Sequence, residues 1–386
     1  MTFNLAPILE TDLHVHLYGC LTAQDIWLLG RDVWRERRER LDVFAARFES
    51  SFGRRPRFQE YWTKDDGQEL LKADWQCLEA VNFEQFEAKF GLPIALFPVS
   101  PAKDWLRVLD AVLRRHLAEG RRHVEYRMVY PPPHARVVPG DFFTELCTGM
   151  RRASIDSGGA FTATLAVSLS RDCTIALQQY RIIRDWQEHA PKDLLPILTG
   201  IDFSGYEEAF PPRELAPVAG LLHEDNLANS KSALALLIHA GETCENDRLD
   251  EALARIEAAV DMGAHRIGHA LALGTAVEGG SSPLVAARDR ILEKLSAADS
   301  AVIECCITSN LRLGGVATPQ KHPVRRFLDQ GLRVCFATDD PGMFGVDGVK
   351  EAAVAQSAVG AQSLEKVMKV TPSFRSEVLS GRSEHE

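Results

Sequence analysis

The chain has 386 residues, a formal net charge of −10 and a hydrophobic content of 45%, so it can bury a large core. The acidic balance argues against a nucleic-acid-binding surface, since phosphate binding needs basic patches. No apolar run approaches the roughly 20 residues that cross a bilayer, the first ten residues lack the pattern of a signal peptide, and the eight cysteines contain no C-x-x-C pair. We therefore expect a cytoplasmic protein with free thiols, and neither a nucleic acid nor a membrane as its partner.

Eight short segments rich in apolar and β-branched residues recur along the chain. Most are separated by stretches with apolar residues at helical spacing, as in 249–262. Strands that alternate with helices pair in parallel, and eight such units predict a closed (β/α)8 TIM barrel of the α/β class. The predicted strands are 8–16, 122–130, 161–169, 195–203, 233–240, 264–270, 301–306 and 332–339.

About a hundred residues separate the first two predicted strands, far more than a crossover needs. We expect residues from about 20 to 120 to form a helical insertion over the C-terminal mouth of the barrel. We expect residues 1–370 to form one domain and the polar segment 371–386 to be a loosely ordered tail. The helical patterns in the insertion lie at 22–50, 66–90 and 102–119.

Two imidazoles lie two residues apart near the N-terminus. Because side chains on a strand repeat every two residues, His14 and His16 point to the same side, which suits two ligands of one metal ion. His239 ends a second apolar run, and Asp339 ends another. Three imidazoles and a carboxylate, each at the C-terminal end of a strand, predict a catalytic metal site.

Each of these signals has a simpler interpretation when it stands alone. His14 and His16 could be buried histidines that only satisfy a hydrogen bond, and the doublet Asp339-Asp340 could cap a helix before Pro341. Gly241 lets the backbone turn tightly and bring Glu242 back toward the pocket. The combination of these segments, in this chain order, favours a metal site over the simpler interpretations.

Six segments at these strand ends resemble the adenosine/AMP deaminase family of metal-dependent amidohydrolases, and the resemblance extends from residue 11 to about 345. The segments are Leu13-His14-Val15-His16-Leu17, Gly200-Ile201-Asp202-Phe203-Ser204-Gly205, His239-Ala240-Gly241-Glu242, Arg266-Ile267-Gly268-His269-Ala270, Thr308-Ser309-Asn310 and Ala337-Thr338-Asp339-Asp340-Pro341.

The resemblance implies one Zn²⁺ per chain. Its ligands would be His14, His16, His239 and Asp339, with one position open for a water whose pKa falls towards about 7. The resemblance also implies a metal-dependent hydrolase that attacks a 6-aminopurine nucleoside, such as adenosine or a derivative, at C6 and releases ammonia.

The resemblance further assigns roles around the substrate. Glu242 would protonate the ring nitrogen N1, His269 would orient the water, and Asp340 would contact N7, which makes these three the expected catalytic residues. The backbone N–H of Gly205 would contact N3. The positions expected to bind the substrate are His16, Tyr18, Gly205 and Asp340.

One position departs from the family. Tyr18 stands where these enzymes usually carry an acidic residue that contacts the ribose, which should weaken ribose recognition and favour a bare base or a nucleoside with an altered 5′ end. Adenosine still ranks first among the expected substrates, because the resemblance to the family is strong. The alternatives are a deaminase of adenine, a pterin or a pyrimidine, and, from another class, a non-catalytic zinc-binding protein. A binuclear site is disfavoured, because the fourth strand ends in Leu198-Thr199-Gly200-Ile201-Asp202 without the lysine that two-metal members carry.

The remaining histidines fall in helical or polar contexts and are expected at the surface. They are His116, His123, His134, His189, His223, His265 and His322.

Overall fold

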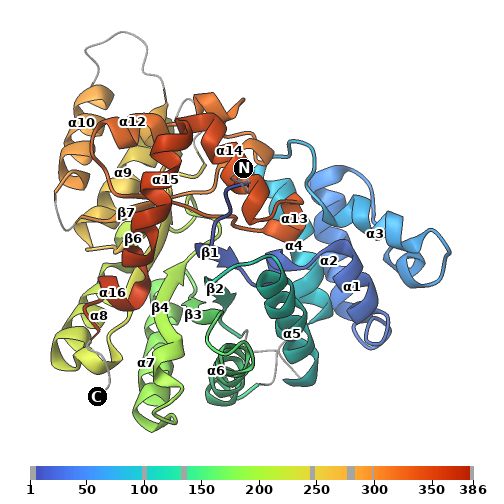
Figure 1. Cartoon of the computed structure of the whole chain (residues 1–386). Helices are drawn as coiled ribbons and strands as arrows, with labels where there is room; N and C mark the ends of the chain where they lie inside the picture. The colour runs from blue at the N-terminus through green and yellow to red at the C-terminus, as the bar shows by residue number, and fades with distance from the viewer. Residues whose placement is uncertain are drawn as a thin grey trace, which may run out of the picture.

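The computed structural model describes residues 6–97, 102–131, 137–243, 248–275, 283–297 and 300–382 (Figure 1). Within these ranges eight parallel strands pair in the order β1 to β8. The ring closes where Val15 bridges Asp339: the His16 amide donates to the Asp339 carbonyl and the Asp339 amide to the His14 carbonyl, both at 2.9 Å. The strands are β1 (Thr11–His16), β2 (His123–Val129), β3 (Thr162–Ser168), β4 (Leu198–Phe203), β5 (Ala235–Ala240), β6 (Arg266–His269), β7 (Val302–Cys305) and β8 (Val334–Phe336).

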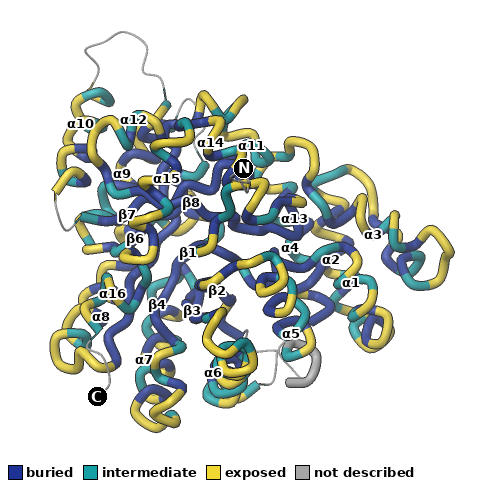
Figure 2. Tube along the Cα trace, in the orientation of Figure 1, coloured by how far each residue is buried: buried dark blue, intermediate teal, exposed yellow. Residues whose placement is uncertain are grey.

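The TIM barrel and all eight predicted strands are confirmed, each strand being slightly shorter than its predicted range. Strands such as β4 and β5 are buried along their whole length, because helices cover the outside of a parallel barrel while side chains fill its interior. Figure 2 shows this layering: the strands and the inner faces of the helices are buried, and the outer faces of the helices are exposed.

The helices surround the strands. The pattern at 249–262 is confirmed as a helix between β5 and β6. The helices after β2 are α6 (Pro139–Asp156), α7 (Cys173–His189), α8 (Ala216–Ala228), α9 (Leu249–Asp261), α10 (Pro283–Leu295), α11 (Ile307–Arg312), α12 (Val324–Asp329), α13 (Pro341–Phe344), α14 (Gly348–Val359), α15 (Ala361–Val370) and α16 (Ser376–Leu379).

The span between β1 and β2 is helical, as predicted. Its fourth helix, α4, begins with a capping box in which Asn82 accepts from the Gln85 amide at 2.8 Å and Gln85 reaches back to the Asn82 amide. The Phe90 ring of α4 lies 6.4 Å from the ring of His16, centroid to centroid, so the insertion forms one wall of the region at the end of β1. The helices of the span are α1 (Ala23–Gly30), α2 (Arg38–Phe52), α3 (Gly67–Trp75), α4 (Phe83–Leu96) and α5 (Ala102–Ala118).

The expectation of a loosely ordered tail is wrong as far as residue 382. Ser376 donates its hydroxyl to Glu125 at 2.8 Å, and Arg266 donates to the carbonyl of Phe374 at 2.8 Å. The segment is ordered because it supplies partners for charged side chains buried in the barrel. Residues 383–386 lie outside the described ranges.

Three histidines expected at the surface are instead buried. His116 bonds to the Tyr126 hydroxyl at 2.7 Å and His123 to Thr162 at 2.8 Å, while His322 bonds to Asn310 at 3.0 Å. Burial is tolerated because each ring has a hydrogen-bond partner. His189 and His223 are exposed as predicted, His265 is half-buried, and His134 lies outside the described residues.

No helix in the described part of the chain is long and apolar enough to cross a membrane. The seven cysteines that the structure describes are all free.

Candidate active site

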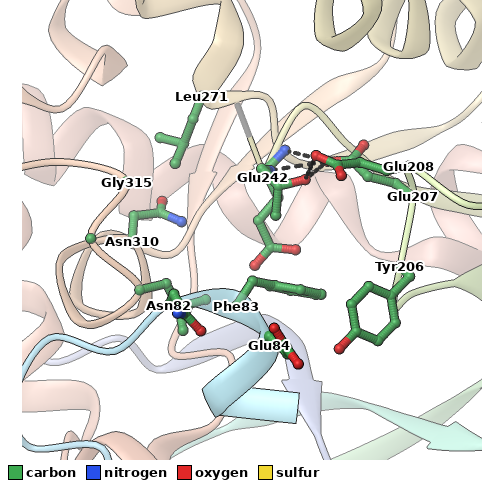
Figure 3. Close-up of a pocket in the computed structure, with 13 residues that line it drawn as sticks. Asn82, Phe83, Glu84, Tyr206, Glu207, Glu208, Glu242, Leu271, Asn310 and Gly315 are labelled. Atoms are coloured by element: carbon green, nitrogen blue, oxygen red, sulfur yellow. Dashed lines mark hydrogen bonds between the residues drawn. The ribbon is translucent and has the colours of Figure 1, made fainter. Parts of the chain in front are cut away.

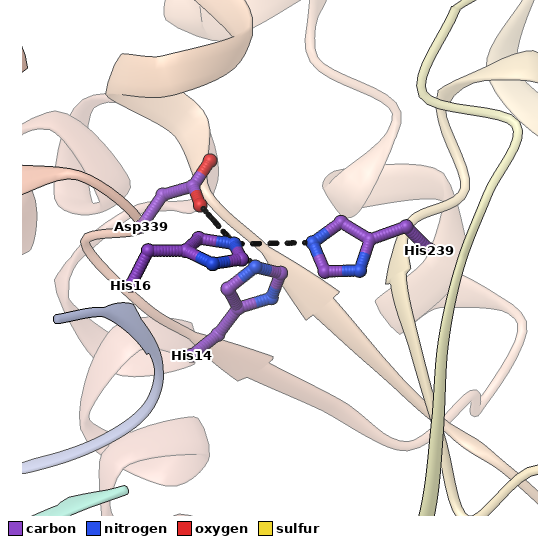
Figure 4. A group of neighbouring side chains, drawn as sticks. All are labelled: His14, His16, His239 and Asp339. Carbon is purple, nitrogen blue, oxygen red and sulfur yellow. Dashed lines mark hydrogen bonds and ion pairs between the residues drawn. The ribbon is translucent and has the colours of Figure 1, made fainter. Parts of the chain in front are cut away.

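The four predicted metal ligands meet at the C-terminal ends of β1, β5 and β8 (Figure 4). One nitrogen from each of His14, His16 and His239 and one oxygen of Asp339 all lie within 4.8 Å of one another. The Nε2 atoms of His16 and His239 are 3.3 Å apart, close to the roughly 3.4 Å that separates two nitrogens bound tetrahedrally to zinc at about 2.1 Å. The donor set therefore fits a single zinc ion.

Two buried carboxylates orient two of these imidazoles. Glu304 on β7 lies 2.8 Å from Nδ1 of His14, and Asp202 on β4 lies 3.3 Å from Nδ1 of His239. A carboxylate at Nδ1 keeps the proton there and leaves Nε2 free to bind a metal. Arg127 on β2 joins the pair, contacting Asp202 at 3.1 Å and Glu304 at 2.6 Å.

The roles of these three charged residues could not be assigned from the sequence alone. The signal that could have found them is a lone charge inside an apolar strand, which is too costly to bury unless it is paired. Its partners were not identifiable, because they lie on strands 75 and 177 residues away.

Backbone strain is concentrated at the same place. In the described residues, three non-glycine residues have positive φ: His269 at 66°, Ala270 at 51° and Asp339 at 65°. Such conformations cost of order 1–3 kcal/mol each and persist where the surrounding structure imposes them. Two of the three are a predicted metal ligand and a predicted catalytic residue, so the strain points to this site.

The turn after β5 presents Glu242. Gly241 has a φ of +68°, and a side chain there would lie 2.4 Å from Ile256, so only glycine fits. The buried carboxylate of Glu207 accepts the backbone N–H groups of Gly241, Glu242 and Thr243 at 2.7, 2.9 and 3.0 Å (Figure 3). Glu207 is a fourth residue whose role could not be assigned from the sequence, and it holds the turn that positions Glu242.

Glu242, His269 and Asp340 lie beside the predicted ligands. Nε2 of His269 is 3.4 Å from Glu242 and 3.9 Å from Asp339. Burial, together with the charges of Asp339 and Glu207, raises the pKa of Glu242 well above its usual range. Burial lowers the pKa of His269 well below its usual range. The two shifts favour the uncharged forms, a protonated carboxyl on Glu242 and a neutral imidazole on His269.

The carboxyl group of Asp340 lies against the backbone of Gly19. A Cβ atom at residue 19 would lie 1.6 Å from Oδ1 of Asp340, so there is no room for a side chain. Burial, reinforced by the charges of Asp339 and Glu242, raises the pKa of Asp340 well above its usual range. A protonated Asp340 can donate a hydrogen bond, which suits a ring nitrogen acceptor.

These side chains line a cavity of about 230 Å³. Most of its polar lining residues lie at the strand ends and on the loops that follow them, while α4 contributes Phe83, Phe86 and Phe90. A second cavity of about 580 Å³ adjoins it at Phe83 and Glu242 (Figure 3). The smaller cavity is lined by His16, Phe83, Phe86, Glu87, Phe90, Ile94, Val129, Ser204, Gly205, His239, Glu242, His269, Asp339 and Asp340.

Of the four predicted substrate-binding residues, the structure brings three to this cavity. His16, Gly205 and Asp340 line it, and Gly205 has a φ of +82°. Tyr18 lines neither cavity: it is buried, and its hydroxyl donates to the carbonyl of Phe97 at the end of α4. A substrate contact by Tyr18 is therefore not supported, and its bond to α4 explains why a tyrosine fits at this position.

The sequence is similar to known deaminases. A family model described as adenosine deaminase matches residues 67–371. An adenosine deaminase of Escherichia coli is 26% identical over 361 residues, which is 91% of this chain and 87% of that protein.

Solved structures show the same fold. The N6-methyl-AMP deaminase of Arabidopsis thaliana superimposes with a TM-score of 0.64 at 17% identity, covering 95% of this chain and 93% of that one. The adenine deaminase of Arthrobacter aurescens has a TM-score of 0.60 at 20% identity, covering 99% and 94%. An amidohydrolase of Burkholderia ambifaria with bound Zn has a TM-score of 0.62 at 18% identity, covering 98% and 86%.

Proposed function

Because the chain belongs to the adenosine deaminase family, we propose that it is a zinc-dependent enzyme that deaminates adenosine or a related adenosine derivative. Its reaction class is the hydrolytic deamination of an aminopurine, and the products would be an inosine-type nucleoside and ammonia. The observation that carries the proposal is the convergence of His14, His16, His239 and Asp339 within 4.8 Å, directly beside Glu242 and His269.

Each residue of the site has a task in this proposal. A zinc ion held by the four ligands would lower the pKa of a water towards about 7. Glu242, whose raised pKa favours the protonated carboxyl, would give its proton to N1 of the ring, because the ring carbon resists attack until its neighbouring nitrogen is protonated. Asp340 would donate a hydrogen bond to N7, and the Gly205 amide would donate one to N3.

The charge of the cavity lining favours a nucleoside over a nucleotide as the substrate. Within the described residues the lining of the two cavities includes Glu84, Glu87, Glu207 and Glu208 but no lysine or arginine. A phosphate would find no counter-charge there and would be repelled by the carboxylates. We therefore rank adenosine and uncharged derivatives above AMP-type substrates.

A second candidate is the deamination of a bare base such as adenine, or of another aminated heterocycle. Two observations favour it. The 230 Å³ cavity is smaller than the roughly 300–1,000 Å³ of most ligand sites, and its lining includes Phe86, Phe90 and Ile94 of α4, which offer a ribose no polar side-chain partner. A non-catalytic zinc protein is disfavoured, because Glu242 and His269 are not needed to hold a metal.

One experiment tests these proposals together. Metal analysis of the purified protein should give one zinc per chain. A chelator should abolish ammonia release from adenosine, adenine, AMP and a pterin, and release of the substituted amine from N6-substituted adenosines. Release of ammonia from AMP alone would contradict the substrate ranking. Two metals per chain, or full activity with none, would contradict the metal site.

A variant pair isolates the ligand set. His14→Ala should lose both zinc and activity. His123→Ala is the matched control, because His123 is a buried histidine at the other end of the barrel, bonded to Thr162; it should keep its zinc. The cytoplasmic compartment stays a prediction, supported by the free cysteines.

A further inference from the structure

Three buried side chains outside the metal ligands form a continuous hydrogen-bonded row that ends at the reaction cavity. Nδ1 of His269 lies 3.0 Å from Nδ2 of Asn310, and Oδ1 of Asn310 lies 3.0 Å from Nε2 of His322. All three are at most 3% exposed. Beyond them, the backbone N–H of Val324 points at Nδ1 of His322 over 3.1 Å.

The direction in which hydrogen bonds are donated along the row is set at its far end, where His322 meets Val324. Val324 is the first residue of α12, where backbone N–H groups have no partner within the helix. A backbone N–H can only donate, so Nδ1 of His322 must accept. A neutral His322 then carries its proton on Nε2 and donates it to Asn310. Burial lowers the pKa of His322 to about 3, which agrees with a neutral ring.

The donor and acceptor roles of Asn310 and His269 follow from the bond between His322 and Asn310. Once Oδ1 of Asn310 accepts from His322, its amide nitrogen faces His269 and can only donate. Nδ1 of His269 must therefore accept. The opposite arrangement would turn the amide of Asn310 over and put a proton on Nδ1 of His322, where it would collide with the N–H of Val324.

We propose that Asn310 and His322 are positioning residues that fix the tautomer of His269, so that its Nε2 presents an N–H to the reaction cavity. In the described structure this Nε2 has no hydrogen-bond partner and is aimed between Glu242 and Asp339, at 3.4 and 3.9 Å. His269 thus offers a hydrogen-bond donor, rather than a lone pair, to an oxygen atom in the cavity. The inference rests on the proposed function only in taking that oxygen to belong to the attacking water.

The tautomer can be measured directly. In protein labelled with ¹⁵N-histidine, long-range ¹H–¹⁵N correlation spectra distinguish a ring protonated on Nε2 from one protonated on Nδ1, and His269→Asn identifies the signals. We expect the Nε2–H form of His269 in the wild-type protein as isolated. The Nδ1–H form would overturn the proposal. This spectrum decides the proposal even if no aminopurine is turned over, so its failure and that of the proposed function are distinguishable.

Two variants test the row itself. Asn310→Asp keeps the shape but can only accept, so it should move the proton of His269 to Nδ1 and lower kcat at least about tenfold, with the zinc content unchanged. An unchanged tautomer in this variant would contradict the proposal.

At the far end of the row, His322→Gln keeps a donor for Asn310, whereas His322→Leu does not. Glutamine should retain the wild-type tautomer and rate, and leucine should lose both. His123→Gln controls for the loss of a buried histidine outside the row and should change neither. Equal behaviour of the two His322 variants would contradict the proposal; if His322→Leu does not fold, the wild-type and Asn310→Asp spectra carry the test.

Discussion

The pKa values of three carboxyl groups within one cavity are shifted in different directions. Burial raises the pKa values of Glu242 and Asp340 well above the usual range, and neighbouring carboxylates add to the effect. Burial acts on Asp339 too, but His14, through its charge and its hydrogen bond, outweighs it and holds the pKa of Asp339 well below the usual range. The shifts favour the carboxylate form of Asp339, which is the form that binds a metal, and the protonated forms of Glu242 and Asp340.

This division of charge predicts the effect of Glu242→Gln. Glutamine has the same size but no proton to transfer, so turnover should fall by at least about 10², within the range of general acid–base catalysis. The zinc content should stay at the wild-type level, because Glu242 is not a ligand. Steady-state kinetics with metal analysis check both; near-normal turnover would remove Glu242 from the mechanism.

At the scale of elements, one carboxylate holds a whole turn. Glu207 accepts three successive N–H groups at residues 241 to 243 and pairs with Arg255 at 3.2 Å. The side chain of Glu242 is therefore placed by a residue on the loop after β4, and the two loops form one unit.

Glu207→Gln should loosen this unit. The amide of glutamine carries one acceptor oxygen instead of two, so at least one N–H of the turn loses its partner, and kcat should fall about tenfold or more since catalytic geometry tolerates little displacement. Zinc binding should persist. Glu214→Gln, at an exposed glutamate of the same connection, is the control. Equal kinetics in the two variants would show that the hydrogen bonds from the turn to Glu207 are not needed for catalysis.

The packing of α14 on α11 predicts a pH dependence of stability. Glu351 on α14 accepts the N–H groups of Ile307 and Thr308 at 2.8 and 3.2 Å, at the start of α11. Such bonds favour the carboxylate form, but burial dominates and raises the pKa of Glu351 from 4.5 to about 7. The folded protein thus holds a proton that the unfolded chain releases above pH 4.5.

The contribution of Glu351 to the free energy of unfolding should therefore be fully present below about pH 4.5 and should decline as the pH rises to about 7. The total loss should be about 3 kcal/mol, at 1.36 kcal/mol per unit of pKa shift. Urea unfolding at pH 5, 6, 7 and 8 should show this decline, and Glu351→Gln should remove that part of it. Glu365→Gln, at an exposed glutamate of α15, should leave it in place. An identical slope in wild type and Glu351→Gln would refute the assignment.

In the molecule as a whole, the C-terminal segment packs against the barrel. Phe374 packs against Leu13, Val302 and Cys335 in a small apolar cluster, and its carbonyl accepts from Arg266. The end of the chain is thus part of the core.

Ending the chain after Val370 should lower the thermal midpoint by at least about 5 °C, since it uncovers this cluster and leaves buried charges with fewer partners. A chain ending after Arg382 keeps every one of these contacts and is the control. Differential scanning calorimetry compares the two, and equal midpoints would contradict a structural role for 371–382.

The barrel could be predicted because its strands are continuous apolar runs, and the clustering of His14, His16, His239 and Asp339 because each follows or ends such a run. Arg127, Glu304 and His322 could not be assigned, since the reason for burying each is a partner far away in the chain. The same holds for Tyr18: its place in the motif suggested a sugar contact, while its actual partner is the carbonyl of Phe97. Local patterns reveal strands and ligands, but not which polar groups face each other across a core.

The carboxylates of Glu304 and Asp202 also bear on how such a protein is made in a cell. Zinc fingers stay unfolded until their ion arrives. Here His14 and His239 have carboxylate partners, Glu304 and Asp202, at 2.8 and 3.3 Å, so protein groups alone orient both rings, and we expect the chain to fold before an ion binds. Newly made chains would then form a folded reserve, and the amount of working enzyme would follow the supply of metal instead of the rate of translation.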